Sequence, residues 1–190
     1  MATVSDVLAF WFEELTEADW YAGGDALDST IRARFGAVWG AARRGDLTGW
    51  QGNPRGVLAF LIVTDQMSRN MHRQSARAFE TDGIAHAAAF RASVQGWDMR
   101  IEGPARQFMY TPFMHAETLA DQNRSVASYA LKLKEGDAEH LLHARAHREV
   151  IRKFGRFPAR NIALGRTSSV AESEYLALGG YGALIKSLRG

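Results

Sequence analysis

The sequence predicts an all-α fold. Apolar residues recur at three- and four-residue spacing along most of the chain, and glycine and proline fall mainly between these stretches. Alternating patterns typical of β-strands are nearly absent. We expect a single domain over residues 1–190, with about eight to ten helices, because a chain of this length can bury roughly two-thirds of its unfolded surface.

The first two expected helices carry apolar residues on one face. Residues 4–14 form an apolar opening segment. Residues 27–44 place Ile31, Phe35 and Val38 about one helical turn apart, and Gly45 ends that stretch. This spacing is the amphipathic helical pattern, and glycine is a common helix stop.

The next expected helix is central. Asn53 is a good cap and Pro54 suits a first helical turn. The octet 56–63 is apolar on every face, so a short buried strand is the competing interpretation. We prefer a helix because the run continues to Met71 without a breaker.

The second half continues in the same way. Pro112 predicts a break after a short helix over 104–110. Ser169 and Glu172 form a capping box that predicts a late helix. The remaining expected segments are 81–94, a pair over 116–134 and 137–154 joined at Gly136, and a short terminal segment after Gly179 and Gly180.

Composition excludes several classes of function. The chain has no cysteine, so disulfides, thiolate metal sites and cysteine nucleophiles are excluded. A net charge of +2 is too small to indicate nucleic-acid binding. No apolar run predicts a membrane span and no export signal is visible, so we expect a cytoplasmic protein.

Charge is distributed unevenly along the chain. Seven acidic residues precede the first basic residue, Arg32, whereas residues 141–166 hold seven basic residues against Glu149 alone. One interpretation is that the acidic start packs near the basic end, and the other is an anion site.

Asp65 and Arg69 lie one turn apart at the end of the central helix. A charge that leaves such an apolar helix should be paired, so an internal ion pair is one interpretation. In the other, Arg69, Asn70 and Arg73 form one wall of a polar cleft.

A second polar group comprises His115, Glu117 and Asp121. Like charges at positions 117 and 121 are unfavourable on one helix face unless a cation lies between them, and Arg124 is a candidate. A divalent metal is the alternative, but this spacing matches no recognised metal motif, so we predict no metal site.

Histidines 140, 143 and 147 share a predicted helix face with apolar residues. His143 and His147 could bind a metal together, although the pattern lacks the glutamate of a zincin motif. We interpret His140 and His143 as core residues and keep His147 as a candidate acid–base residue.

The stretch 154–166 follows the end of a long helix. It sets Arg156, Arg160 and Asn161 among large apolar residues, beside a glycine and a proline. Backbone geometry after a helix can direct such side chains inward, and a helix beginning near Pro158 would add free N–H groups for an anion.

These motifs together resemble the bacterial domain of unknown function 924 family. The matching residues span nearly the whole chain: Phe10-Trp11-Phe12, Asp65-Gln66, Ser68-Arg69-Asn70, Arg77-Ala78-Phe79, Tyr110, Pro112-Phe113-Met114-His115, Glu117, Asp121-Gln122, His147, Phe154-Gly155-Arg156-Phe157-Pro158, Arg160-Asn161 and Leu164-Gly165-Arg166.

The resemblance implies an antiparallel helical array of the tetratricopeptide (TPR-like) type whose polar motifs converge. It brings no established activity. Members of the family usually have serine where this chain has Ala116, and often have an acidic residue at the position of Asn123 and histidine at that of Ala159. The missing histidine weakens any metal or general-base proposal that would use it.

The leading functional hypothesis is an internal polar cleft that binds a small anionic ligand, a carboxylate or phosphate, without a cofactor. Its predicted ligand-binding residues are Asp65, Arg69, Asn70, Arg156, Arg160 and Asn161. A hydrolase with a His/carboxylate site, with or without the help of a metal ion, is the second hypothesis, with His115, Glu117, Asp121 and His147 as candidate catalytic residues. A TPR-like module that binds a protein partner is the third.

Overall fold

The computed structural model describes residues 1–133 and 138–189. Within them the chain is all-α, with eleven α-helices, shorter 3-10 and π-helical segments, and no strand. The predicted fold class is therefore confirmed, while the TPR-like arrangement stays a prediction. The predicted joint at Gly136 lies outside the described residues.

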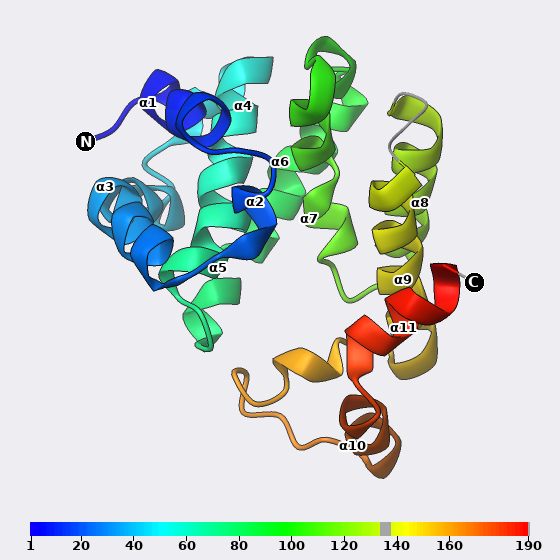
Figure 1. Ribbon diagram of the computed structural model, residues 1–190. Coiled ribbons are helices and arrows are strands. Elements are labelled where there is room, and N and C mark those ends of the chain that lie inside the picture. The colour runs from blue at the N-terminus through cyan, green and yellow to red at the C-terminus, as the bar shows by residue number, and fades with distance from the viewer. Residues whose placement is uncertain (134–137, 190) are drawn as a thin grey trace. The chain divides into compact units, whose positions relative to one another are not determined.

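The chain divides into two compact units, Met1–Pro112 and Phe113–Gly190, and each is described by itself. The helices, labelled in Figure 1, are α1 Val4–Ala9, α2 Asp19–Ala22, α3 Asp25–Arg44, α4 Pro54–Leu61, α5 Ser68–Met71, α6 Asp82–Val94, α7 Thr111–Met114, α8 Leu119–Lys132, α9 Ala138–Phe154, α10 Val170–Ala177 and α11 Gly180–Arg189.

The first unit is organised around one continuous helical column. α4 is followed directly by a π-helical segment, Ile62–Met67, and then by α5, so the preferred helix is confirmed and the strand alternative is wrong. The column contacts α1, α3 and α6, and every residue from 56 to 65 is buried. An apolar helix covered on all sides is the expected centre of such a unit.

The start of this column depends on two residues. The Asn53 side chain accepts a hydrogen bond from the Gly56 backbone N–H at 2.9 Å, which confirms the predicted cap. A Cβ atom on Gly56 would lie 2.0 Å from the carbonyl oxygen of Trp50. Only glycine therefore lets α4 approach the 3-10 segment Thr48–Gly52 so closely.

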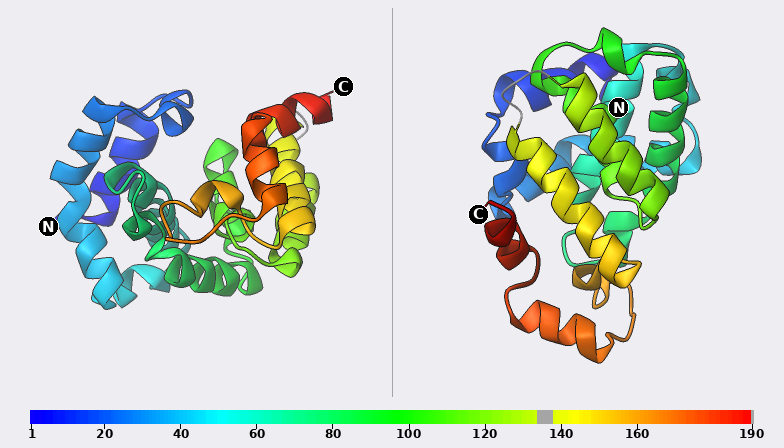
Figure 2. Two further views of the ribbon diagram at one scale, coloured as in Figure 1. Left: turned by 90° about the horizontal axis from the view of Figure 1, so that it is seen from below. Right: turned by 90° about the vertical axis from the view of Figure 1, so that its right-hand side faces the viewer.

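The second unit is a helical hairpin extended by two shorter helices. Figure 1 shows α8 and α9 side by side and antiparallel, and α11 contacts α9. Figure 2 shows the same pair from a second direction. Val150, Ile151 and Phe157 form its core, and Tyr175 and Tyr181 from α10 and α11 pack against them. α9 therefore carries most of what positions the candidate site.

Three predicted boundaries differ from the structure. α8 begins at Leu119 instead of residue 116, because Thr118 caps it by accepting from the Asp121 N–H. Pro112 lies in the first turn of α7. N–H groups in a first turn have no helical partner, so the missing N–H of proline costs no hydrogen bond there. The helix expected at Pro158 is a single 3-10 turn, Pro158–Arg160, too short to offer a helix terminus to an anion.

Candidate functional site

The predicted site residues divide between the two units. Asp65, Arg69 and Asn70 belong to the first unit. The second unit holds His115, Glu117, Asp121, His147, Arg156, Arg160 and Asn161. Their contacts are described within each unit.

In the first unit Arg69 is held by internal acceptors. Its guanidinium lies 3.9 Å from a carboxylate oxygen of Asp65 and 2.8 Å from Asp82, and it also donates to the Ala78 carbonyl. The guanidinium carbon is 4.6 Å from the centre of the Phe79 ring. These contacts fix the end of the central column against the start of α6.

Asn70 and Arg73 converge on one carboxylate. Asp28 of α3, 5% exposed, accepts from Asn70 at 2.8 Å and from Arg73 at 2.7 and 3.0 Å. Burial raises the pKa of Asp28, but the hydrogen bonds from Arg73 and Asn70 outweigh it and bring that pKa below its usual value. Asp28 therefore ties α3 to α5 as an ionised group.

Replacing Asp28 with alanine is expected to lower the free energy of unfolding of this unit by about 2 kcal/mol, because it leaves the buried Asn70 amide unpaired and removes a charge-assisted bond. Urea denaturation followed by circular dichroism measures the loss. The matched control is Asp25→Ala on the same helix, where the side chain is exposed. Equal effects of the two substitutions would contradict this role for Asp28.

In the second unit Glu117 is the carboxylate that organises the chain around the cavity. It accepts from Arg166 through both oxygens, at 2.9 and 2.8 Å, and from the Phe157 N–H at 2.9 Å. Burial raises the pKa of Glu117, yet the Arg166 and Phe157 hydrogen bonds and the nearby Arg160 charge leave it below the usual range. A carboxylate held in this way is an ionised anchor and a poor proton acceptor.

Asp121 has a local role. Its carboxylate accepts from the Thr118 hydroxyl at 2.7 Å in the first turn of α8. Glu117 precedes the helix and pairs with Arg166, so the predicted repulsion between two carboxylates on one helix face does not arise. The buried Gln122 amide donates to the carbonyls of Met114 and Ala116 at 2.7 and 2.8 Å and holds the loop that carries His115.

Arg156 and Asn161 meet a second internal carboxylate. Glu172, 3% exposed, accepts from Arg156 at 2.6 and 2.7 Å, from Asn161 at 3.4 Å and from the Ser169 N–H at 2.7 Å. The Arg156 hydrogen bond and the Ser169 N–H lower the pKa of Glu172 to about 2. The predicted capping box is confirmed, and it also supplies the partner of Arg156.

His147 lies at the centre of a group of rings from α9 and α11. Its Nδ1 is 2.9 Å from the His143 carbonyl oxygen and 3.0 Å from the Tyr181 hydroxyl. A carbonyl can only accept, so Nδ1 carries the hydrogen and Nε2 is an acceptor. Nε2 has no hydrogen-bond partner within residues 1–133 and 138–189.

A hydrogen-bonded chain leads from this ring toward the surface. The Tyr181 hydroxyl lies 2.6 Å from His143 Nδ1, and His143 Nε2 lies 3.2 Å from Glu139, which also pairs with Arg189. His143 is therefore a half-exposed link between α9 and α11 instead of the core residue we expected.

Burial lowers the pKa of His147 to about 3, and the neighbouring His115, whose ring centre is 6.2 Å away, adds to this effect. The imidazole is thus neutral across the physiological range. It presents a lone pair and no charge.

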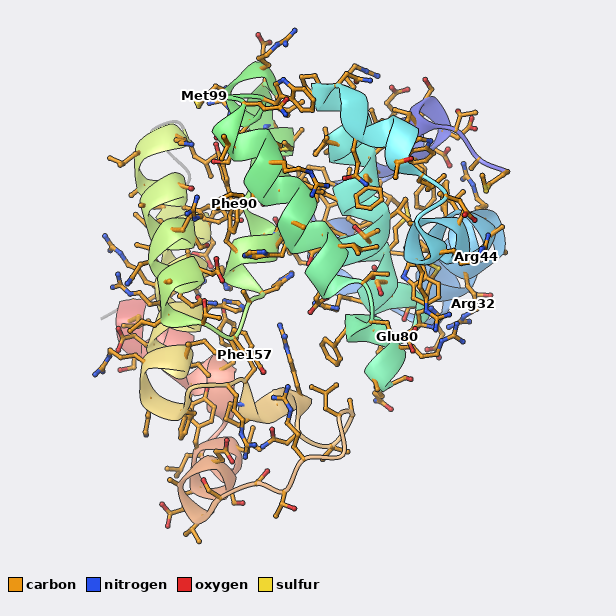
Figure 3. All side chains as sticks on the ribbon, turned by 180° about the vertical axis from the view of Figure 1, so that it is seen from behind. Arg32, Arg44, Glu80, Phe90, Met99 and Phe157 are labelled. Carbon is orange, nitrogen blue, oxygen red and sulfur yellow. The ribbon has the colours of Figure 1, made fainter. Side chains whose placement is uncertain are left out.

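His147 borders a cavity of about 280 Å³ in the second unit. Its wall is largely apolar, and Arg160, His147 and the two tyrosines bring polar groups to it. Figure 3 labels Phe157, at the start of the turn after α9. The Arg160 guanidinium carbon lies 4.4 Å from the centre of that ring. The lining residues are His147, Val150, Phe157, Pro158, Ala159, Arg160, Tyr175 and Tyr181.

Of the predicted residues, the cavity brings together His147 and Arg160. Glu117, Arg156 and Asn161 support the chain around it through the ion pairs above, and Asp121 caps a helix. The described part of the chain contains no group of three or more His, Asp or Glu side chains arranged to hold a metal ion. No helix among the described residues is long and apolar enough to cross a membrane.

Sequence reasoning missed both tyrosines. Tyr181 lies 34 residues after His147 and 38 after His143, on a different helix. No local spacing connects such residues. The available signal was the helical spacing of Tyr181, Leu184 and Ile185, which form an apolar face that needs a surface to pack against.

Comparisons with known proteins agree with this fold. A solved structure of a protein of unknown function from Agrobacterium tumefaciens matches with a TM-score of 0.85 and 33% sequence identity, over 91% of this chain and 96% of that one. No curated protein matches the chain. The family model described as "Bacterial protein of unknown function (DUF924)" matches residues 7–180. The chain therefore belongs to the DUF924 family, as the sequence motifs predicted.

Proposed function

We propose that the second unit binds a small carboxylic acid in the cavity beside His147, with Arg160 as the residue that holds the carboxylate. The observation that carries the proposal is a guanidinium on the wall of a mostly apolar cavity. Such a cavity favours ligands with an apolar body and few polar contacts. Arginine matches a carboxylate with two parallel hydrogen bonds.

The local charge balance supports an anion. Three arginines, at positions 156, 160 and 166, accompany two carboxylates, Glu117 and Glu172. Arg166 and Arg156 each form a close pair with one of these carboxylates, and the charge of Arg160 also acts on Glu117. All three guanidinium groups contribute positive potential where the carboxylate is proposed to bind.

The neutral His147 adds a further preference. Because Nε2 is an acceptor, it would repel a carboxylate oxygen and pair with an O–H or N–H donor. A carboxylate at Arg160 with a hydroxyl or amine on the adjacent carbon meets both requirements. We therefore expect a 2-hydroxy acid to bind more tightly than the matching unsubstituted acid.

A hydrolase is the less favoured alternative. An effective general base has a pKa near the working pH. His147, with a pKa of about 3, is always deprotonated near neutral pH but holds a proton weakly. Glu117 is held ionised by Arg166. These two groups suit recognition of a ligand better than transfer of a proton.

The test is calorimetric titration with propanoate, lactate and inorganic phosphate. Arg160→Gln is expected to weaken carboxylate binding roughly 10- to 100-fold, since a hydrogen bond to a charged group contributes about 1.5–3 kcal/mol. The matched control is Arg145→Gln, which removes the same charge from an exposed position on α9. Absence of binding by all three anions, or equal binding by both variants, would overturn the proposal.

A further inference from the structure

We propose that the ligand also has an unbranched hydrocarbon chain, which lies in the groove formed by α9, α10 and α11. This inference rests on the proposed function, because it takes the carboxylate to be held at Arg160. The ligand class is then a medium- or long-chain fatty acid or its 2-hydroxy derivative.

The groove is largely apolar. It has a volume of about 430 Å³, and Phe154, Tyr175, Leu178 and Leu184 contribute to its wall. Leu178 is 79% exposed there, a large apolar surface left to water. The charged residues of the groove cancel, since Arg152 and Lys153 accompany Glu149 and Glu174. A neutral, apolar occupant fits such a surface.

The groove adjoins the cavity. Val150 and Tyr175 line both, so these two side chains form the wall between them. The Tyr175 ring packs at 5.0 Å from the Phe154 ring, and its hydroxyl has no hydrogen-bond partner in the described part of the chain. Rotation of the Tyr175 side chain would therefore break no hydrogen bond. Such a rotation would join the groove and the cavity into one continuous channel.

A hydrocarbon chain fits this arrangement better than a peptide. Helices form the groove, and their backbone groups are bonded internally, so an extended peptide would find no strand edge to pair with. A helical peptide is about 10 Å across and could not continue past Tyr175 into the cavity. A chain of CH₂ groups needs no hydrogen bonds and is thin enough to follow both spaces.

The first experiment titrates butanoate, hexanoate, octanoate and decanoate, each below its aggregation concentration. Affinity is expected to rise about fourfold per added CH₂, the factor that corresponds to about 0.8 kcal/mol. 1-Octanol and octyltrimethylammonium serve as head-group controls. They are expected to bind far more weakly than octanoate.

The outcomes separate the two proposals. If butanoate binds and affinity does not rise with length, the hydrocarbon inference is overturned and the carboxylate site stands. If 1-octanol binds as tightly as octanoate, the groove holds a chain but the carboxylate site at Arg160 is overturned. If none of the acids binds, both are overturned.

A matched pair of variants locates the chain. Leu178→Glu places a charge in the groove at a residue too exposed to contribute to the core. It is expected to weaken decanoate roughly tenfold or more and to leave butanoate unchanged. Leu131→Glu is the control, because Leu131 on α8 is 82% exposed and does not line the groove. Decanoate affinity that is the same in both variants would overturn the inference, once circular dichroism shows that both are folded.

Discussion

Replacing Phe108 with alanine is expected to lower the free energy of unfolding of the first unit by about 4 kcal/mol. The Phe108 side chain is fully buried, and its ring centre lies 5.9 Å from that of Trp11, 5.8 Å from Phe12 and 5.1 Å from Trp20. Truncation removes these contacts and leaves a cavity that rigid aromatic neighbours cannot fill, a change that typically costs about 3–5 kcal/mol.

The matched control for this prediction is Phe90→Ala. Phe90 lies on α6, is 41% exposed and is labelled in Figure 3. The Phe90→Ala substitution should cost clearly less, about 2 kcal/mol or below, because a smaller part of the Phe90 side chain is withdrawn from water. Urea denaturation of both variants gives the comparison. Similar losses in the two would show that the aromatic cluster is not a stabilising core.

Replacing Glu117 with glutamine is expected to destabilise the second unit by about 2 kcal/mol at pH 7. Breaking a fully buried ion pair costs about 3–5 kcal/mol and an exposed one close to nothing; Glu117, at 23% side-chain exposure, lies between. The substitution leaves Arg166 without a carboxylate and weakens the acceptor of the Phe157 N–H. The control Glu174→Gln removes one charge from an exposed residue of α10.

The effect of Glu117 should depend on pH with a definite sign. Its folded-state pKa lies below the ordinary value of 4.5, so its contribution is complete above that pH and is lost as the pH falls through the folded-state value. The wild-type and Glu117→Gln curves should therefore converge in acid. A constant difference down to the lowest pH would contradict the role of an ionised Glu117.

The same variant should have an opposite effect on binding. Removing the Glu117 charge leaves the positive charge of Arg160 and Arg166 less compensated, so a carboxylate in the cavity should bind more tightly. A variant that loses both stability and affinity would indicate that Glu117 positions the cavity wall instead.

The helices were predictable because the buried face of a helix requires an apolar residue about every three or four positions. The stripe of Ile31, Phe35 and Val38 and the unbroken run from Pro54 to Met71 each specify a helix by themselves. The π-helical segment Ile62–Met67 could not be predicted, since no residue type requires that wider turn.

The candidate site was predictable only in part. His147 and Arg160 stood out because histidine on an apolar face and arginine after a helix break are unusual. Their surroundings depend on pairings between distant residues, such as Arg156 with Glu172 and Glu117 with Arg166. Several carboxylates could satisfy each arginine equally well in the sequence, and only packing selects one.

The division into two units has a spectroscopic consequence. All five tryptophans lie in the first unit, at positions 11, 20, 39, 50 and 97, while the second unit has tyrosines but no tryptophan. Intrinsic tryptophan emission therefore reports on the first unit, whereas helical ellipticity reports on both. If the two units unfold at different temperatures, the melting curve followed by tryptophan emission will differ from the curve followed by ellipticity. The order of unfolding can therefore be measured without attaching a label.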